Sequence, residues 1–243
     1  MSESNQVLPI ITHTSEEFHG ANWHTIASEI EAETLTHFIQ DAIENGQVID
    51  LESNEESVSI VTSDNTRLIV QNDDLVSAFP FFKSEQRLEL DIEAIQEWSN
   101  VNGLEAVVTA IDPSGYEVDF FASDYAMNAD IYQEESPIVA NLTGMAYILE
   151  EFNAQAATEI EGLEYSADCS DLIPTEESAT YVAIGLVKKI TKHNLGHVAG
   201  YIVTLDSIID YELEIFVADF NLKTELTIDQ HVYCTIWMTG SIE

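Results

Sequence analysis

Positively charged side chains are scarce in this sequence. It has 7 Lys and Arg residues against 45 Asp and Glu residues, a formal net charge of −38 over 243 residues. No Lys or Arg precedes Arg67, and none lies between Arg87 and Lys188. The resulting field of one sign repels phosphate backbones and anionic membranes and attracts basic proteins. We therefore expect a basic protein partner and no direct contact with nucleic acid or membrane.

Targeting segments and a disulfide framework are also missing. The start of the chain, Met1–Asn5, lacks the cationic residues and the apolar run of a signal peptide. No apolar stretch approaches the ~20 residues that span a bilayer. Two cysteines, Cys169 and Cys234, are too few for a disulfide scaffold. These absences predict a soluble, cytoplasmic protein.

Recognised catalytic signatures do not occur either. The sequence has no Gly-x-Ser-x-Gly elbow, no phosphate-binding glycine loop and no His-Glu-x-x-His motif. Carboxylates are so frequent that no pair stands out as a general acid and base. We expect a protein that is not an enzyme and that holds no cofactor.

Three histidines near the N-terminus are the strongest metal candidates. His13, His19 and His24 lie close to Glu16 and Glu17, and imidazole with carboxylate can hold a divalent metal. Their spacing matches no established zinc pattern and lacks the compact i, i+4 pairing of a helical site. The sequence therefore favours a polar, partly flexible N-terminal segment and no metal site.

The first third of the chain has the pattern of a small α+β unit. Hydrophobic content of 45% excludes an unfolded acidic tail. Apolar residues at helical spacing predict a helix over 24–45, in one or two pieces, and β-prone runs follow at 47–51, 57–63 and 67–71. Asp64–Thr66 is a plausible hairpin turn between the last two runs.

The remainder contains an internal repeat. Residues 92–125 align with 187–220 at a constant offset of 95, and within 104–125 six of 22 positions are identical to their counterparts. The identical pairs are Val108/Val203, Thr109/Thr204, Tyr116/Tyr211, Glu117/Glu212, Phe121/Phe216 and Asp124/Asp219. Further along, a two-residue gap aligns Val139 with Val232 and Met145 with Met238. We interpret this register as two copies of one small β unit.

Each copy has a long first strand, a hairpin partner, a third strand, a short crossing and a last strand. In the second copy these lie at 180–191, 198–205, 211–217, 221–229 and 231–242. Gly185 interrupts the first strand, where a glycine commonly permits a bulge or a sharp coil. This order resembles an OB-fold barrel over 86–149 and 180–243. OB barrels bind nucleic acids, sugars or proteins, so the resemblance does not select a function.

The predicted fold class is α+β, mostly β, with an N-terminal helix and small sheet followed by two OB-like five-stranded barrels. The expected divisions are an α+β unit over 1–84, a first barrel over 85–150, an acidic connector over 151–179 and a second barrel over 180–243.

Several acids form rows that could contact a basic partner. Glu117 and Asp119 are two apart on a predicted strand and so point the same way ~6.6 Å apart, and their repeat counterparts are Glu212 and Glu214. On the predicted helix the neighbouring acids are Glu29 with Glu33 and Asp41 with Glu44. These rows resemble a phosphate array in sign and spacing; the other interpretation is a solvated face.

The basic residues cluster at one place, Lys188, Lys189, Lys192, His193 and His197. This cluster could be the ligand loop of the second barrel or an internal counter-charge, but the sequence favours an ordinary solvated hairpin.

Two function classes follow. The first is a non-enzymatic interaction protein whose acidic surface binds a basic partner, as a nucleic-acid mimic, an inhibitor or an immunity-type protein. The alternative is an OB-type binder of a neutral ligand or protein, with the acidity an adaptation to salt. Its stacking surface could come from aromatic side chains, with candidates Tyr116, Tyr125, Tyr211, Phe220, Trp98 and Trp237.

Overall fold

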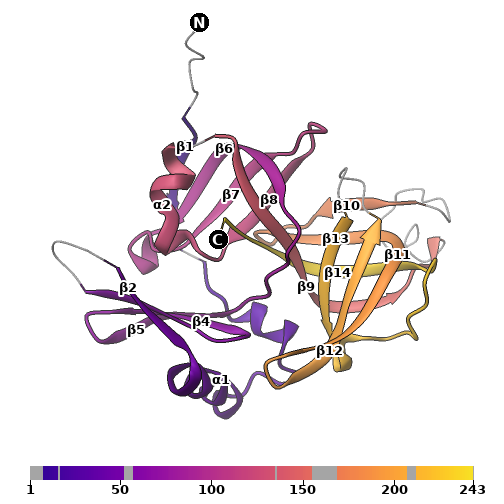
Figure 1. Ribbon diagram of the computed structural model, residues 1–243, viewed down its shortest axis with the longest axis horizontal. Helices are drawn as coiled ribbons and strands as arrows, with labels where there is room; N and C mark the ends of the chain where they lie inside the picture. The colour runs from indigo at the N-terminus through magenta and orange to yellow at the C-terminus, as the bar shows by residue number, and fades with distance from the viewer. Residues whose placement is uncertain are drawn as a thin grey trace, which may run out of the picture.

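The computed structural model describes residues 8–15, 17–51, 57–134, 136–154, 169–206 and 212–242. The fold is α+β and mostly β, as the sequence predicted: a small four-stranded sheet with a helix lies beside a ten-stranded sheet curled into two barrels (Figure 1).

The small sheet has the strand order β2-β3-β4-β5. Its strands are β2 (Gln47–Leu51), β3 (Val58–Thr62), β4 (Thr66–Gln71) and β5 (Asp74–Pro80). The first three match the predicted runs, whereas β5 went unrecognised. Asn72 and Asp73 both have positive φ, 52° and 68°, which turns β4 tightly into β5.

The predicted helix over 24–45 is shorter than expected. Helix α1 spans Ala32–Asn45, and a 3₁₀ helix, η1, spans Ala21–Thr25. Helix α1 buries Phe38 and Ala42 and contacts β3 and β4. Glu29 therefore lies outside the helix, and the predicted pairing of Glu29 with Glu33 on one helical face is wrong. The apolar residues before Ala32 have helical spacing, which extended the predicted helix. In the structure Ile26 and Ala27 instead pack in the core without forming an α-helix.

The large sheet contains both barrels. Its order is β1-β6-β7-β8-β14-β9-β13-β12-β11-β10, with additional pairings β6–β9 and β14–β11 that close a barrel on each side. The strands of the first half are β1 (Ile10–Thr14), β6 (Leu88–Trp98), β7 (Ala106–Ile111), β8 (Glu117–Ala122) and β9 (Ile138–Glu151). Those of the second half are β10 (Asp171–Pro174), β11 (Thr180–Leu195), β12 (Val198–Asp206), β13 (Glu212–Ala218) and β14 (His231–Ser241).

Both predicted crossings are present. Helix α2 (Tyr125–Glu134) connects β8 to β9, and the 3₁₀ helix η3 (Asp219–Asn221) begins the connection from β13 to β14.

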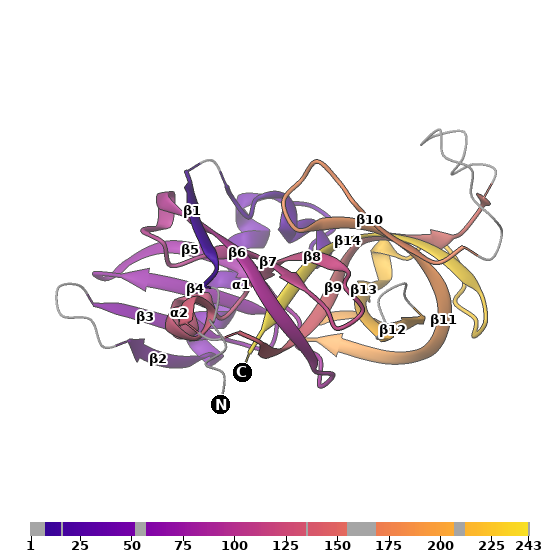
Figure 2. The same cartoon turned by 90° about the horizontal axis from the view of Figure 1, so that it is seen from above.

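The two barrels share their last strands, β9 and β14. Barrel 1 is β6-β7-β8-β14-β9, and it is completed by the end of β14, where Thr239 and Gly240 pair in parallel with β8. Barrel 2 is β11-β12-β13-β9-β14, and its fifth strand is the middle of β9, where Thr143–Met145 pair in parallel with β13. The sequence predicted barrels built from 86–149 and 180–243 separately. That part of the prediction is wrong, because β9 and β14 are long enough to serve both barrels and pair with each other between them (Figures 1 and 2).

The internal repeat is confirmed in the pairing register. Ile95 pairs with Val108, and the residues 95 positions later, Ile190 and Val203, also pair. A bulge falls between Ile92 and Ala94 in β6 and between Val187 and Lys189 in β11, which are equivalent positions.

Gly185 has a different role from the predicted one. The bulge in β11 lies at Lys188, and a Cβ at Gly185 would approach the carbonyl oxygen of Asp206 to 2.7 Å. The glycine therefore allows the backbones of β11 and β12 to approach each other closely.

Two hydrophobic cores organise the molecule. One fills the barrels with alternate residues of their strands, among them Ile95, Val108, Val203 and Ile236. The other lies between the small sheet and the barrels and is rich in aromatic rings, including Trp23, Phe38, Phe79, Trp98, Phe121, Phe216 and Trp237. The second core ties the N-terminal unit to the barrels and contains the site described next.

Two short strands extend the barrels at their edges. Strand β1 pairs in parallel with β6, and β10 pairs antiparallel with β11. Part of the expected acidic connector thus forms a strand, while residues 155–168 fall outside the described part of the chain. The four-part division of the chain stays a prediction.

Candidate functional site

The N-terminal strap, residues 17–27, brings a histidine into the aromatic core. It runs from β1 toward α1 through η1 and contacts β5 and β9. His19, Trp23, Ile26 and Ala27 are all buried, with His19 only 7% exposed. The expectation of a polar segment is wrong at His19 and Trp23, because these side chains are buried between the sheets.

Four aromatic rings surround the His19 imidazole. The ring centroids of Phe79, Trp98 and Phe121 lie 4.8–4.9 Å from it, and that of Trp237 lies 5.7 Å away. We call these four rings the aromatic cage. They come from β5, β6, β8 and β14, so the cage forms only when the small sheet and both halves of the repeat meet.

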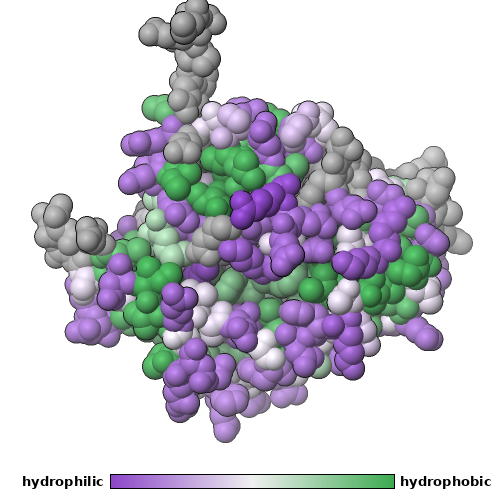
Figure 3. Space-filling view, in the orientation of Figure 1, coloured by the Kyte–Doolittle hydropathy of each residue, from purple (hydrophilic) through white to green (hydrophobic). Residues whose placement is uncertain are grey.

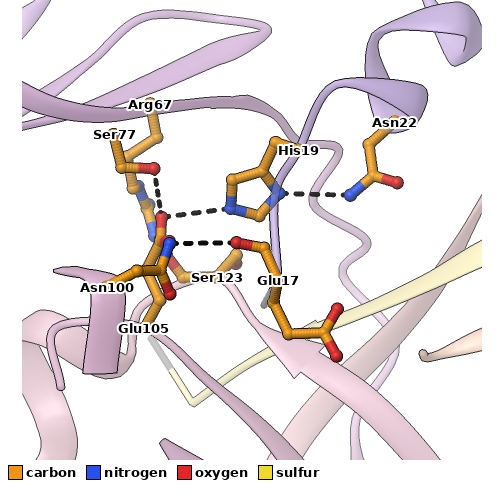
Figure 4. Close-up of polar contacts among 8 residues, drawn as sticks. All are labelled: Glu17, His19, Asn22, Arg67, Ser77, Asn100, Glu105 and Ser123. Atoms are coloured by element: carbon orange, nitrogen blue, oxygen red, sulfur yellow. Dashed lines mark hydrogen bonds and ion pairs between the residues drawn. The ribbon is translucent and has the colours of Figure 1, made fainter. Parts of the chain in front are cut away.

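A buried carboxylate holds the imidazole in this cage. His19 Nε2 lies 3.1 Å from Oε1 of Glu105, whose side chain is 2% exposed. Ser77 donates its hydroxyl to the same oxygen at 2.6 Å. On the other side of the ring, Asn22 Nδ2 lies 3.1 Å from His19 Nδ1 (Figure 4). The Tyr147 hydroxyl donates to Asn22 Oδ1 at 2.8 Å.

This chain of hydrogen bonds assigns the proton on the imidazole. Because the Asn22 amide donates to Nδ1, Nε2 carries the proton and donates it to Glu105. Burial raises the pKa of the Tyr147 hydroxyl, which keeps it a donor. Every donor in this hydrogen-bonded network then faces an acceptor, as a buried polar network requires.

The arrangement does not activate a nucleophile. In a catalytic triad the serine hydroxyl bonds to the histidine, whereas here Ser77 and His19 both bond to one carboxylate oxygen. The hydrogen bonds of His19 and Ser77 therefore satisfy the buried Glu105 carboxylate. They also join the strap, β5 and barrel 1.

A second buried polar group lies against the same core. Arg67 is 3% exposed, donates from Nη1 to the Ser123 carbonyl, and places its guanidinium 4.6 Å from the Phe81 ring centroid. Asp124 accepts hydrogen bonds from the Tyr132 hydroxyl and from the backbone N–H of Ile242. Burial raises the pKa of Asp124 in spite of these bonds.

An open groove borders the His19–Glu105 pair. It has a volume of about 450 Å³. Its lining includes Glu17, Phe18, His19, Trp23, Leu35, Val76, Ser77, Trp98, Asn100, Val101 and Glu105. We call it the strap groove.

The predicted acidic rows are present but are divided between the barrels. Glu117 and Asp119 lie on β8, Glu212 and Glu214 lie on β13, and β14 and β9 run between these strands. Glu117 and Glu212 are exposed. Asp119 accepts the Thr109 hydroxyl and Glu214 accepts the Ser84 hydroxyl, each at 2.6 Å, so these two acids also have internal bonds.

The helical acids lie on the surface of α1. Glu33 and Glu44 are exposed and Asp41 is half-buried. Asn45 donates to Asp41 and Gln40 donates to Glu44, at 2.8 and 2.9 Å. Hydrogen bonds from side-chain amides within the helix thus hold two of its carboxylates.

The structure disperses the three N-terminal histidines. His13 lies on β1 with Nδ1 3.2 Å from Glu97, His19 is in the cage, and His24 is exposed. Among the described residues, no group of three or more His, Cys, Asp or Glu side chains could hold a metal ion.

The basic cluster is also divided. Lys188 pairs with Asp206 at 2.9 Å, and His197 stacks on Phe38 at 4.6 Å. Lys189 and His193 line an open groove over barrel 2, and Lys192 is exposed.

Sequence reasoning missed Glu105, Ser77 and Trp98 as parts of one site. One signal existed: Glu105 directly precedes the apolar strand β7, at a position where the repeat has Gly200. A charged residue where the equivalent position has no side chain marks a place where the two copies differ in their surroundings.

Comparison with known proteins identifies no family. Neither a protein-family model nor a curated protein matches the chain. Over the described residues, no helix is both long and apolar enough to cross a membrane. A solved structure of the cytoplasmic molybdate-binding protein ModG, with molybdate bound, is similar to this chain at 15% sequence identity and a TM-score of 0.36. The similarity covers 67% of this chain and 99% of that one.

Proposed function

We propose that this protein is a non-enzymatic binding protein that holds a basic protein partner against its acidic surface. The observation that carries the proposal is the net charge of −38, which arises because only 7 Lys and Arg residues oppose 45 Asp and Glu residues. Solubility requires a much smaller excess charge, of magnitude about 2–8 for a small domain.

The placement of the cations supports the proposal. Arg67 is buried, Lys188 is paired with Asp206, and the Lys223 ammonium donates to the Phe220 carbonyl. Burial of Arg67 and the pairing of Lys188 with Asp206 reduce the positive charge of the surface, whereas Lys223 is exposed and stays a surface cation. Hydrophilic side chains cover much of the face in Figure 3.

The barrels present exposed acids at equivalent positions, Glu117 on β8 and Glu212 on β13. Because Asp119 and Glu214 also hold internal hydroxyl groups, Glu117 and Glu212 are the better pair for testing surface charge alone.

Binding kinetics test this function. A partner captured from native lysate at about 0.05 M salt should be basic, and its association rate should fall steeply toward about 0.3 M, because screening shortens the attraction. The E117Q/E212Q variant should slow association more than it speeds dissociation. The matched control is E89Q/E225Q, which removes two exposed charges elsewhere. A neutral or acidic partner, bound equally at both salt concentrations, would refute the proposal.

A second candidate function is ligand binding by barrel 2. An open groove of about 760 Å³ lies over β11–β13, lined by residues that include Phe82, Lys189, His193, Ile202 and Glu214. OB-type barrels bind oligosaccharides on their second and third strands and on the loop between the first two. A neutral oligosaccharide that raises the melting temperature of the protein, but not that of a His193→Ala variant, would support this function. Its binding should be insensitive to salt, which separates it from the first proposal.

A further inference from the structure

Two exposed histidines from distant parts of the sequence meet on the surface. His37 lies on helix α1, and His197 lies at the tip of the hairpin between β11 and β12, which reaches that helix (Figure 1). Their ring centroids are 5.7 Å apart, and the ring planes are inclined by 43°. Among the described residues, neither imidazole has a hydrogen-bond or ion-pair partner. The nitrogens of both rings are therefore open to a ligand from solution.

The packing of His197 leaves its nitrogens accessible. Its ring stacks on Phe38, with the centroids 4.6 Å apart and the planes inclined by 29°. Stacking covers a face of the imidazole, whereas Nδ1 and Nε2 lie on the edge of the ring. Phe38 is itself buried, so it gives the imidazole a fixed support. His37 is the preceding residue of the helix and is exposed beside it.

The small sheet fixes the tip of the hairpin. Asn65, in the turn between β3 and β4, donates from Nδ2 to the Leu195 carbonyl at 3.1 Å. Gly196 has a φ of 59°, and a Cβ there would lie 2.6 Å from the same Nδ2, so the tip is packed closely against Asn65. Leu195 and Val198, on either side of His197, are buried in the aromatic core. The two imidazoles are therefore brought together without a rearrangement of the backbone.

The distance between the rings suits one metal ion bound to both. Metal–nitrogen bonds of about 2.0–2.1 Å place each ring centroid ~3.2 Å from the ion, so two rings on one ion have centroids ~5–6 Å apart. The observed 5.7 Å lies within this range. Imidazole is a preferred ligand of zinc, nickel and copper, whereas calcium and magnesium prefer oxygen. The chemistry of the pair therefore selects a transition metal.

The surroundings add negative charge but no third protein ligand. Glu33 lies one turn before His37 on α1, is exposed, and lines the same open groove of about 630 Å³. Its charge raises the local concentration of cations. Within the described part of the chain, no group of three His, Cys, Asp or Glu side chains is placed to hold a metal. Water would complete the coordination, as it does at open zinc sites.

We propose that His37 and His197 form a two-histidine site for Zn²⁺, and that the bound ion connects helix α1 to the β11–β12 hairpin. This site goes beyond the proposed function, because it uses neutral imidazoles and not the acidic surface. Zinc binding and capture of a basic partner can therefore each fail without the other.

Calorimetric titration of the full chain with ZnCl₂ tests the site. The protein is first freed of metal and then kept in about 5 mM Mg²⁺, which occupies carboxylates that attract any divalent cation. One Zn²⁺ should bind to each chain. His37→Ala and His197→Ala should each weaken this binding by about ten-fold or more, because each removes one of two protein ligands. His24→Ala, which removes an exposed histidine elsewhere, should change the affinity by less than about two-fold.

Thermal unfolding gives the second measurement. Zn²⁺ should raise the melting temperature of the parent, because the unfolded chain does not hold the two rings together. The increase should be absent in His37→Ala, whose melting temperature in EDTA should match that of the parent, since an exposed side chain is removed. Equal zinc affinity in all three histidine variants, an effect of only one of the two site variants, or no zinc binding above that of magnesium would each overturn the proposal.

Discussion

At the scale of single residues, the interior of this acidic protein depends on a few well-placed polar groups. Glu105 is nearly inaccessible to water, and its charge is satisfied by His19 and Ser77. Because the imidazole is neutral, hydrogen bonds hold the Glu105 carboxylate, and removing one donor leaves this buried group short of a partner. His19 also fills the space between four rings, so its loss would leave a cavity as well.

Replacing this histidine should therefore be costly. We expect His19→Ala to lower the free energy of unfolding by about 3–5 kcal/mol, measured by denaturant titration, because it removes a hydrogen-bond donor and leaves a cavity. His13→Ala, which removes an exposed histidine paired with Glu97, should change it by less than about 1 kcal/mol. Adding Glu105→Gln to His19→Ala should recover part of the loss, because the buried charge disappears. Equal stability of the two histidine variants would contradict this account.

Asp124 should give the opposite response to pH from a salt-bridged acid. Its pKa is raised by burial above the ordinary value of 3.8. Between the unfolded and folded pKa values the folded protein binds more protons than the unfolded chain, so stability falls as pH rises through that window. Asp124→Asn keeps an acceptor for Tyr132 but removes the titration. The free energy of unfolding of the parent should decline as pH rises above ~4, and the variant should lose part of this decline. Denaturant unfolding at several pH values measures both profiles. Identical profiles would refute the prediction.

At the scale of elements, β9 and β14 determine the architecture. Each strand pairs in both barrels, and β9 pairs with β14 along most of its length. Gly240 lies where β14 passes into barrel 1, and its carbonyl accepts the backbone N–H of Ser123. A side chain there would meet the Phe120 ring at 2.5 Å and Leu142 at 2.9 Å.

Gly240→Ala should consequently strain barrel 1. We expect the free energy of unfolding to fall by about 1–3 kcal/mol, the usual cost of overpacking a filled core. Gly20→Ala is the matched control, because a Cβ at Gly20 has nothing within 4 Å and its φ is −50°. Calorimetry that shows equal melting temperatures for the two variants would mean that β14 can shift without cost.

At the scale of the whole molecule, the shared strands and the aromatic core join three parts into one structure. Trp98 of barrel 1, Phe216 of barrel 2 and Phe79 of the small sheet belong to the same buried cluster. Opening either barrel would require withdrawing a strand that the other barrel also uses. The barrels should therefore unfold together.

A core mutation in barrel 2 tests this coupling. Val203 is fully buried, and Val203→Ala should cost about 1–3 kcal/mol. Native-state hydrogen exchange should show the same loss of protection in β7 of barrel 1 as in β12 of barrel 2, since the slowest amides of a cooperative unit report its global stability. A loss confined to β12 would show that the barrels open independently.

The amino-acid sequence by itself determined the charge, the order of the strands and the internal repeat. Alternation of apolar residues is a local property, so β2, β3, β4 and the strands of the second copy were predicted within a few residues. The shared bulges at Glu93 and Lys188 follow from the same register. Of the candidate site, the exposure of Glu117 and Glu212 was predictable, because acids that alternate with apolar residues face outward.

Only the tertiary structure decided which strands close each barrel and which polar residues are buried. The alternation in β9 and β14 is satisfied equally by pairing within a copy or between copies, and the choice depends on packing over the whole sheet. His19 and Glu105 are separated by 86 positions, and His19 and Trp237 by many more. The strap is buried because the distant aromatic rings leave a space that the His19 imidazole fills. In that space the imidazole also satisfies the Glu105 carboxylate.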